Sequence, residues 1–179
     1  MKIAMKNIQE EDFKSAIKNL DKSLKINPTN PSALYFKGYL QIINGENDKG
    51  CKTVVDAIYY NSNTAKTVYA EKCLKFNPKL NIEKFKVGKF SYHILNDNQN
   101  YLFDRKNDIQ YEYYEGKTYQ GKINWLGNGD YTIIANDETE KIIMENPKFY
   151  VRVLKIVNNE YLYEKVEENQ IQFGIIKKL

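Results

Sequence analysis

The chain has 179 residues, of which 42% are hydrophobic, and its formal net charge is +4 at pH 7. This composition is typical of a folded protein of one domain or two small ones, and it excludes a disordered chain. The sequence has no apolar run of about 18 residues and begins without the apolar core of a secretion signal. We therefore expect no membrane segment and a cytoplasmic protein.

The charge is spread rather than clustered. Residues 1–80 hold 13 lysines and 8 acidic residues, which gives +5, and the remaining residues sum to −1. Nucleic-acid-binding domains usually carry a clustered basic face. We therefore expect no nucleic-acid partner.

The N-terminal part has the pattern of amphipathic helices. Apolar side chains recur at spacings of three and four at Phe13, Ala16, Ile17, Leu20 and Leu24, which places them on one helical face. The segment 27–31 then ends one helix and starts the next, with an N-cap asparagine before a proline. This pattern predicts helical hairpins.

These hairpins resemble the tetratricopeptide repeat family over about residues 1–76. The matching positions of the two repeats are Ala16, Leu20 and Pro28, and then Leu34, Gly38, Gly45 and Ala57. A third helix, at about 64–76, serves as a cap. The resemblance implies a helical domain at residues 1–78 whose concave face binds a protein or peptide. By analogy with the family, the residues of that face are Ser32, Tyr35, Tyr39, Ile42, Lys66 and Tyr69.

That tyrosine-bearing face has other possible roles. Tyr35 and Tyr39 could instead pack against a neighbouring helix or against the rest of the chain. Two repeats and a cap are also few for a solenoid, which usually needs about three units. A second copy of the chain is therefore an alternative partner, and a homodimer is possible.

After a linker at residues 79–84, the hydrophobic period changes to two. We expect strands near 85–94, 100–106, 109–115, 118–126, 130–136, 148–157, 160–167 and 170–178. Short connections such as 115–117, 128–129 and 158–159 force neighbouring strands to be antiparallel. The predicted fold class is thus α+β with two domains, and residues 85–179 form an eight-stranded meander, either a small barrel or an open half-barrel. The connection at 136–147 has an apolar centre and is expected to close one end of this domain.

The first strand is similar to the opening of lipocalin-like (calycin) barrels. It carries Gly88-Lys89-Phe90, and Lys177-Lys178 stand where such barrels place a basic residue over the aromatic ring. The resemblance implies a barrel that can hold one small apolar ligand. The inner face would then include Phe90, Tyr111, Tyr113, Trp125 and Phe173.

Residues that could carry catalysis or bind metal are sparse. His93 is the single histidine, and a lone histidine without a cluster does not make a metal site. Cys51 and Cys73 are expected to be buried thiols. Paired carboxylates such as Glu112 and Glu115 fit the solvated face of a strand or a turn. We therefore expect no catalytic residues, no metal and no cofactor.

Two functions remain. The favoured one is a non-enzymatic protein–protein interaction module that uses the short repeat scaffold. The alternative is a carrier of a small apolar ligand that uses the barrel.

Overall fold

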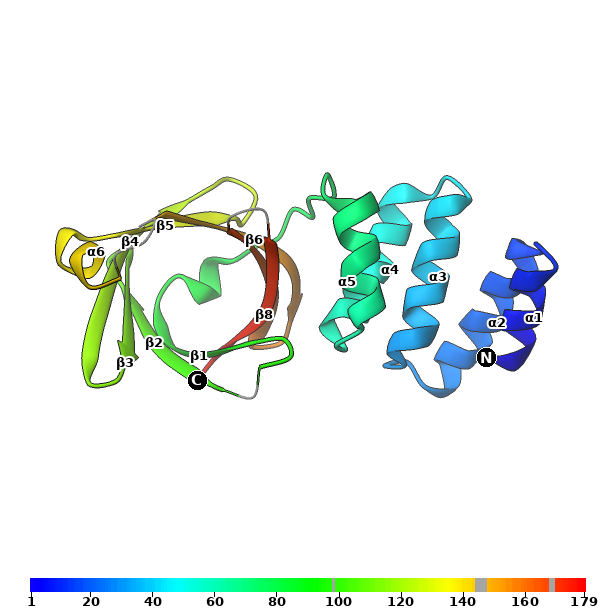
Figure 1. The fold of residues 1–179 in the computed structure, drawn as a ribbon, viewed down its shortest axis with the longest axis horizontal. Coiled ribbons are helices and arrows are strands. Elements are labelled where there is room, and N and C mark those ends of the chain that lie inside the picture. Colours follow the sequence, from blue (N-terminus) through cyan, green and yellow to red (C-terminus); the bar gives the residue numbers. More distant parts are fainter. Residues whose placement is uncertain (98, 144–147, 168–169) are drawn as a thin grey trace. The chain divides into compact units, whose positions relative to one another are not determined.

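We describe a computed structural model of the chain, which covers residues 1–97, 99–143, 148–167 and 170–179. The chain divides into two compact units, Met1–Phe76 and Asn77–Leu179 (Figure 1). The segment expected to be a linker, residues 79–84, belongs to the second unit.

The first unit consists of helices that pack against their neighbours in chain order. They are α1 (Lys2–Gln9), α2 (Phe13–Ile26), α3 (Pro31–Ile43), α4 (Asn47–Tyr59), α5 (Asn63–Val68) and the π-helix η1 (Tyr69–Cys73). Side-chain caps fix three helix starts, because Asp12, Asn30 and Ser62 each accept a hydrogen bond from the backbone N–H three residues on. The hairpins are therefore present, whereas their membership of a repeat family stays a prediction.

Helices α3 and α4 cross with their backbones in contact. A Cβ atom on Gly38 would lie 2.9 Å from the carbonyl oxygen of Gly50, and one on Gly50 would lie 2.8 Å from that of Gly38. Any larger side chain at either position would separate the helices. The two glycines thus explain why this pair of helices packs so closely.

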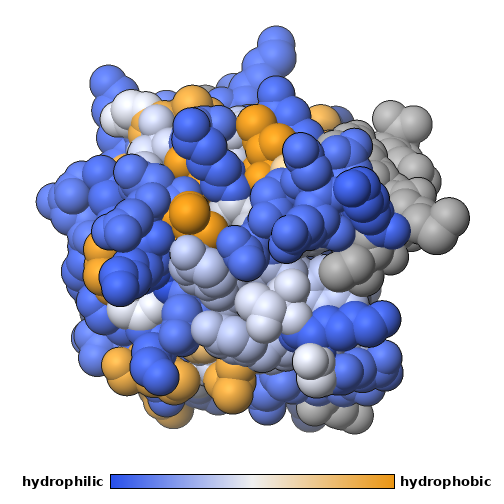
Figure 2. Space-filling model, turned by 90° about the vertical axis from the view of Figure 1, so that its left-hand side faces the viewer, coloured by the Kyte–Doolittle hydropathy of each residue, from blue (hydrophilic) through white to orange (hydrophobic). Residues whose placement is uncertain are grey.

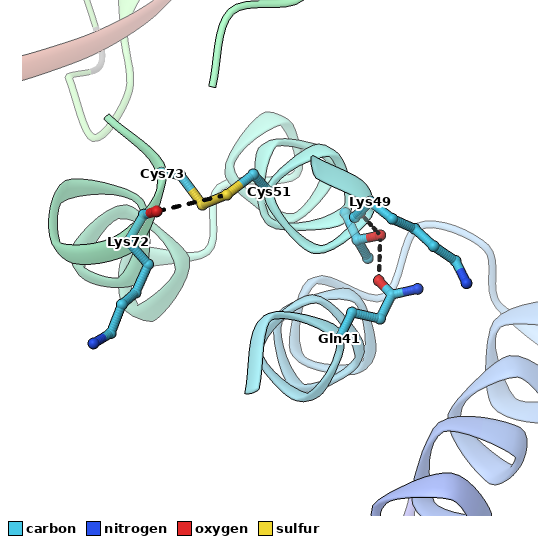
Figure 3. The surroundings of a disulfide bond; sticks show 6 residues. Gln41, Lys49, Cys51, Lys72 and Cys73 are labelled. Carbon is cyan, nitrogen blue, oxygen red and sulfur yellow. Dashed lines mark hydrogen bonds between the residues drawn. A yellow bond between two sulfur atoms is a disulfide. The ribbon is translucent and has the colours of Figure 1, made fainter. Parts of the chain in front are cut away.

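The prediction of free thiols is wrong. Cys51 of α4 and Cys73 at the end of η1 form a disulfide across 22 residues (Figure 3). The packing of α4 against η1 brings the two cysteines together, and sequence spacing alone does not reveal that packing. Disulfides are rare in the cytosol, so the pairing does not fit the expected cytoplasmic location.

The second unit is an antiparallel barrel that closes on itself, because β1 pairs with both β2 and β8. Its strands are β1 (Gly88–Ile94), β2 (Tyr101–Lys106), β3 (Ile109–Tyr114), β4 (Lys117–Trp125), β5 (Tyr131–Ala135), β6 (Lys148–Val157), β7 (Glu160–Glu167) and β8 (Gln170–Lys178). The eight-stranded meander is confirmed, and the choice between barrel and open sheet is decided in favour of a barrel. Each of the eight described strands therefore pairs with a neighbour on both sides, and none of them forms a sheet edge.

Tight turns with positive φ set the register of the hairpins. Glu115 and Gly116 have φ values of 50° and 72° between β3 and β4, and Asn158 has 51° between β6's end and β7. The two-residue turn aligns Tyr114 with Lys117 and hence Gln110 with Gly121. Residues directly opposite each other point to the same face of a sheet, so these turns determine which side chains enter the barrel.

The connection after β5 contains the helix α6 (Asp137–Ile143), which packs against β4 and β5. The Thr139 hydroxyl accepts a 2.7 Å hydrogen bond from the Gln120 backbone N–H. Residues 144–147 of the predicted connection lie outside the described residues. Within the part of the chain that is described, no helix is long and apolar enough to cross a membrane.

Candidate functional site

One end of the barrel interior is filled by protein. The short 3-10 helix η2 (Glu83–Phe85) lies within the ring of strands in Figure 1, and Phe85 is fully buried there. Its ring lies 4.8 Å from Tyr161 and 6.5 Å from Phe90, measured between centroids. Aromatic pairs at these separations add attraction to the burial of their area. We call this region the packed end.

Arg105 of β2 is the polar centre of the packed end. Its side chain is 1% exposed. It donates hydrogen bonds to the Gln110 amide oxygen (2.9 Å), the Phe85 carbonyl oxygen (3.1 Å) and the Tyr131 hydroxyl (2.7 Å). The guanidinium also lies 4.6 to 5.4 Å from the rings of Phe90, Phe103, Trp125 and Tyr131. Because hydrogen bonds and cation–π contacts surround it, the role of Arg105 is to hold this end together.

The opposite end of the interior is hollow. A cavity of about 240 Å³ lies among the inward-facing side chains of the strands, and a second of about 140 Å³ adjoins it and reaches Thr139 of α6. The two share Gln110, Glu112, Ile133 and Phe149 in their linings, and together we call them the hollow. Its further lining includes Tyr92, Ile94, Phe103, Tyr119, Gly121, Val151, Tyr163, Lys165, Gln172 and Ile176.

Most of the lining is apolar, and a few polar groups converge on Glu112 of β3. The Gln110 amide donates a 2.7 Å hydrogen bond to one carboxylate oxygen, and the Tyr92 hydroxyl lies 3.4 Å from the other. Burial raises the pKa of Tyr92 and that of Tyr163 well above the usual tyrosine range, and the nearby Glu112 carboxylate adds to both shifts. Both hydroxyls therefore stay protonated and can act as donors.

A glycine makes room for one of these tyrosines. A Cβ atom on Gly174 of β8 would collide with the hydroxyl and ring of Tyr163. The absence of a side chain there lets the Tyr163 ring lie across β8 and face the hollow. Gly121 similarly leaves space that the side chain of Ile133 occupies.

The predicted ligand residues are distributed differently from expectation. Phe90 does point inward, but it is fully buried in the packed end. Trp125 also lies at that end, where its indole N–H donates a 2.8 Å hydrogen bond to Asp108. Neither residue lines the hollow.

The placement of Tyr111, Tyr113 and Phe173 on the inner face is wrong. Gln110 and Glu112 line the hollow, so the alternating side chains Tyr111 and Tyr113 point outward. Tyr113 is 48% exposed. Gln172 of β8 likewise lines the hollow. Because neighbouring residues of a strand face opposite sides, Phe173 lies on the outer face. An aromatic face is the one expected to point inward, whereas β3 and β8 turn their polar residues Gln110, Glu112 and Gln172 toward the hollow.

The turn between β3 and β4 contains the sequence signal that identifies the inward face of β3. Tyr119, Gly121, Ile123 and Trp125 alternate in β4, and a two-residue turn at 115–116 puts Gly121 opposite Gln110 and Tyr119 opposite Glu112. That register alone assigns Glu112 to the interior. In contrast, nothing in the sequence of β6 and β7 marks Phe149 or Tyr163 as lining residues.

Lys178 lies directly opposite Phe90 in the β1–β8 ladder, and a second basic residue faces the Phe90 ring. Arg105 on β2 lies 5.4 Å from the Phe90 ring. Lys178 lies beside Gly88, and its ammonium donates a 2.7 Å hydrogen bond to the Lys84 carbonyl oxygen. Lys178 thus ties the end of β8 to η2.

In the helical unit, the structure brings together only part of the expected groove. Tyr35 and Tyr39 stack with their ring centroids 6.2 Å apart, and both are partly exposed. Ser32 is exposed, whereas Tyr69 is buried. Ile42 packs where α3 crosses α4, close to Gly50.

Lys66 is held at the start of α5. Its ammonium donates hydrogen bonds of 3.3 and 3.2 Å to the side chains of Asn61 and Asn63. Partial burial lowers its pKa below the usual lysine value. Its hydrogen bonds therefore direct it toward its own helix terminus.

The described residues contain no group of three or more histidine, cysteine or acidic side chains that could hold a metal ion. His93 pairs with Ile175 in the β1–β8 ladder, and its neighbours Tyr92 and Ile94 line the hollow. Alternation therefore places His93 on the outer face.

The outer wall of the barrel on the side of α6 and β3 is mostly hydrophilic, and its hydrophobic residues form small separate patches (Figure 2). In comparisons with known proteins, the chain matches no family model, no curated protein and no solved structure.

Proposed function

We propose that the β unit binds a small, largely apolar molecule in the hollow of its barrel. The observation that carries this proposal is the unequal filling of one interior. Protein side chains fill the packed end, whereas about 240 Å³ stays open between inward-facing side chains at the other end. Protein interiors are otherwise close-packed, with few voids larger than a water molecule.

The lining has the character of a ligand site. Binding pockets are mostly apolar and contain a few well-placed polar groups that fix orientation. Here Ile133, Phe149 and Val151 provide apolar surface, and Glu112 and Tyr92 provide polar groups. Tyr92, Ile94, Glu112 and Ile133 point inward yet are only partly buried, so solvent reaches the hollow. Its volume is small compared with pockets for drug-sized ligands, and this favours a small molecule.

The proposal is tested with an uncharged probe, 2-phenylethanol, titrated into the full chain by calorimetry. The variant Ile133→Trp places a large ring in the hollow and should weaken binding by about tenfold or more, since it removes the space that the probe occupies. The matched control is Ile134→Trp, one residue along the same strand and on the outer face, which should bind like the original protein. Equal binding by both variants would show that the probe does not occupy the hollow.

A second candidate is peptide binding by the helical unit. It is favoured by the stacked pair Tyr35 and Tyr39, whose rings are partly exposed on one helix. Burial raises the pKa of Tyr35, and the nearby Tyr39 and Glu71 add to the shift. Peptides are first selected for binding to the full chain. They should no longer bind a Tyr35→Ala, Tyr39→Ala double variant, and they should still bind the Tyr113→Ala variant. Retained binding to the double variant would exclude this surface.

A further inference from the structure

Glu112 has acceptor capacity that its neighbours do not use. An ionised carboxylate offers about four lone-pair positions, and two donors, Gln110 and Tyr92, approach this one. Among the residues that the structure describes, Glu112 takes part in no ion pair. The Glu112 carboxylate therefore keeps unused acceptor positions that face the hollow.

The surroundings strengthen the attraction for a cation. Charges near a protein surface interact more strongly than they do in bulk solvent, because the protein lowers the effective dielectric constant. The rings of Tyr92, Phe103, Phe149 and Tyr163 also line the hollow, and aromatic faces attract cations. The one lysine in the described lining, Lys165, lies with its ammonium 4.0 Å from the centre of the Phe149 ring, which shows that a cation is accommodated beside these rings.

We infer that the ligand of the hollow is a small primary amine with an aromatic or branched apolar body. Its ammonium group donates hydrogen bonds to the free acceptor positions of Glu112, and its apolar body lies against Ile133, Phe149 and Val151. The Tyr92 hydroxyl and the Gln110 amide keep the carboxylate in place. This inference rests on the proposed ligand function of the hollow and adds the charge of the ligand.

The test compares three probes of similar shape on the full chain by calorimetry at neutral pH: phenethylamine, 2-phenylethanol and 3-phenylpropionate. They present a cation, a neutral hydroxyl and an anion on the same phenyl body. A hydrogen bond to a charged group discriminates by about tenfold or more. We therefore expect phenethylamine to bind about tenfold more tightly than 2-phenylethanol, and 3-phenylpropionate to bind most weakly.

Two variants locate the source of this preference. Glu112→Gln keeps the shape of the side chain and removes its charge, so it should make the amine and the alcohol bind equally. Asp104→Asn removes one negative charge from the neighbouring strand β2, on the outer face opposite Tyr111, and should leave the preference unchanged. This control separates a direct contact from the general effect of net charge.

The possible failures are distinguishable. If 2-phenylethanol binds in the hollow and the amine binds no more tightly, the amine inference is wrong and the ligand site stands. Tighter binding of 3-phenylpropionate would also overturn the inference, because it would make Lys165 the dominant charge. If none of the three probes binds, both the ligand site and the inference fail.

Discussion

The helical unit and the β unit solve the problem of burying a small core in different ways. Each helix of the first unit packs mainly on its neighbours, so the row of helices has two ends. The disulfide between Cys51 and Cys73 lies near one of these ends and holds η1 against α4. The barrel has no such ends, because β1 pairs with β8. Closure by backbone hydrogen bonds keeps its shape even where the interior is not filled.

This difference indicates which unit can leave interior space for a ligand. A row of helices depends on side-chain packing at every contact, as the Gly38–Gly50 crossing shows. A closed barrel can instead separate packing from binding along its axis. In the packed end the charge of Arg105 is surrounded by its partners, whereas in the hollow the charge of Glu112 keeps free acceptor positions.

The largest effect is expected from removing the centre of the packed end. Arg105→Ala should lower the free energy of unfolding of the β unit by about 3–5 kcal/mol, because it leaves a cavity and removes the donors of several buried acceptors. The chain's single tryptophan, Trp125, lies in the β unit, so urea unfolding followed by tryptophan fluorescence reports this unit. Arg105→Met, which refills most of the volume, should cost less. If both variants lose the same free energy of unfolding, the loss of side-chain volume does not contribute to the effect.

The next effect concerns the helical unit. The double variant Cys51→Ser, Cys73→Ser should destabilise it by about 3 kcal/mol, as the loop-entropy relation gives for a bridge that spans 22 residues. Urea unfolding followed by circular dichroism at 222 nm measures the change. A reducing agent should shift the transition of the original protein and not that of the double variant. If the agent has no effect on the original protein, the two cysteines are not paired.

A smaller effect should distinguish the two ends of the barrel. Ile123→Trp adds volume to the packed end, where Ile123 is 2% exposed, and overpacking there should cost about 1–3 kcal/mol. Ile133→Trp adds the same volume to the hollow and should cost less than about 1 kcal/mol, because space is available. Tryptophan fluorescence during urea unfolding measures both variants. Similar costs at the two positions would contradict the contrast between a packed and a hollow end.

The smallest effect is a pH dependence of helix α2. Hydrogen bonds from Ser15, first from its side chain and then from its backbone, lower the pKa of Asp12. Since the folded pKa lies below the unfolded value of about 4, the stabilisation is complete above that value and is lost as the pH falls through the folded pKa. Asp12→Asn should therefore lose less stability than the original protein between about pH 5 and pH 3, as circular dichroism would show. If both proteins lose the same stability over this pH range, Asp12 does not contribute to the pH dependence.

Much of the fold could be predicted from the sequence, because local signals determine it. The strands β6, β7 and β8 have the predicted bounds, since turn residues such as Asn158 separate segments of period two. The caps Asn30 and Ser62 begin helices for a similarly local reason. Contacts between distant segments were less accessible: the pairing of Cys51 with Cys73 depends on how η1 packs against α4.

The candidate site was harder to predict than the fold, because it depends on the orientation of each strand. Large side chains occupy both faces of β3, so the sequence alone favours the aromatic residues Tyr111 and Tyr113 as the lining over Gln110 and Glu112. The register of the 115–116 turn corrects that strand. The unequal filling of the interior has no local signal, because it results from how η2 and Arg105 occupy one end.

The most direct test of the ligand site is a titration of the ¹⁵N-labelled full chain with phenethylamine, followed residue by residue by NMR. We predict that the largest amide shifts occur at Gln110, Glu112, Ile133 and Phe149, which both cavities of the hollow share. Smaller shifts are expected at Arg105 and Trp125 in the packed end. The largest shifts at Trp125, or in residues 1–76, would contradict the assignment of the hollow as the binding site.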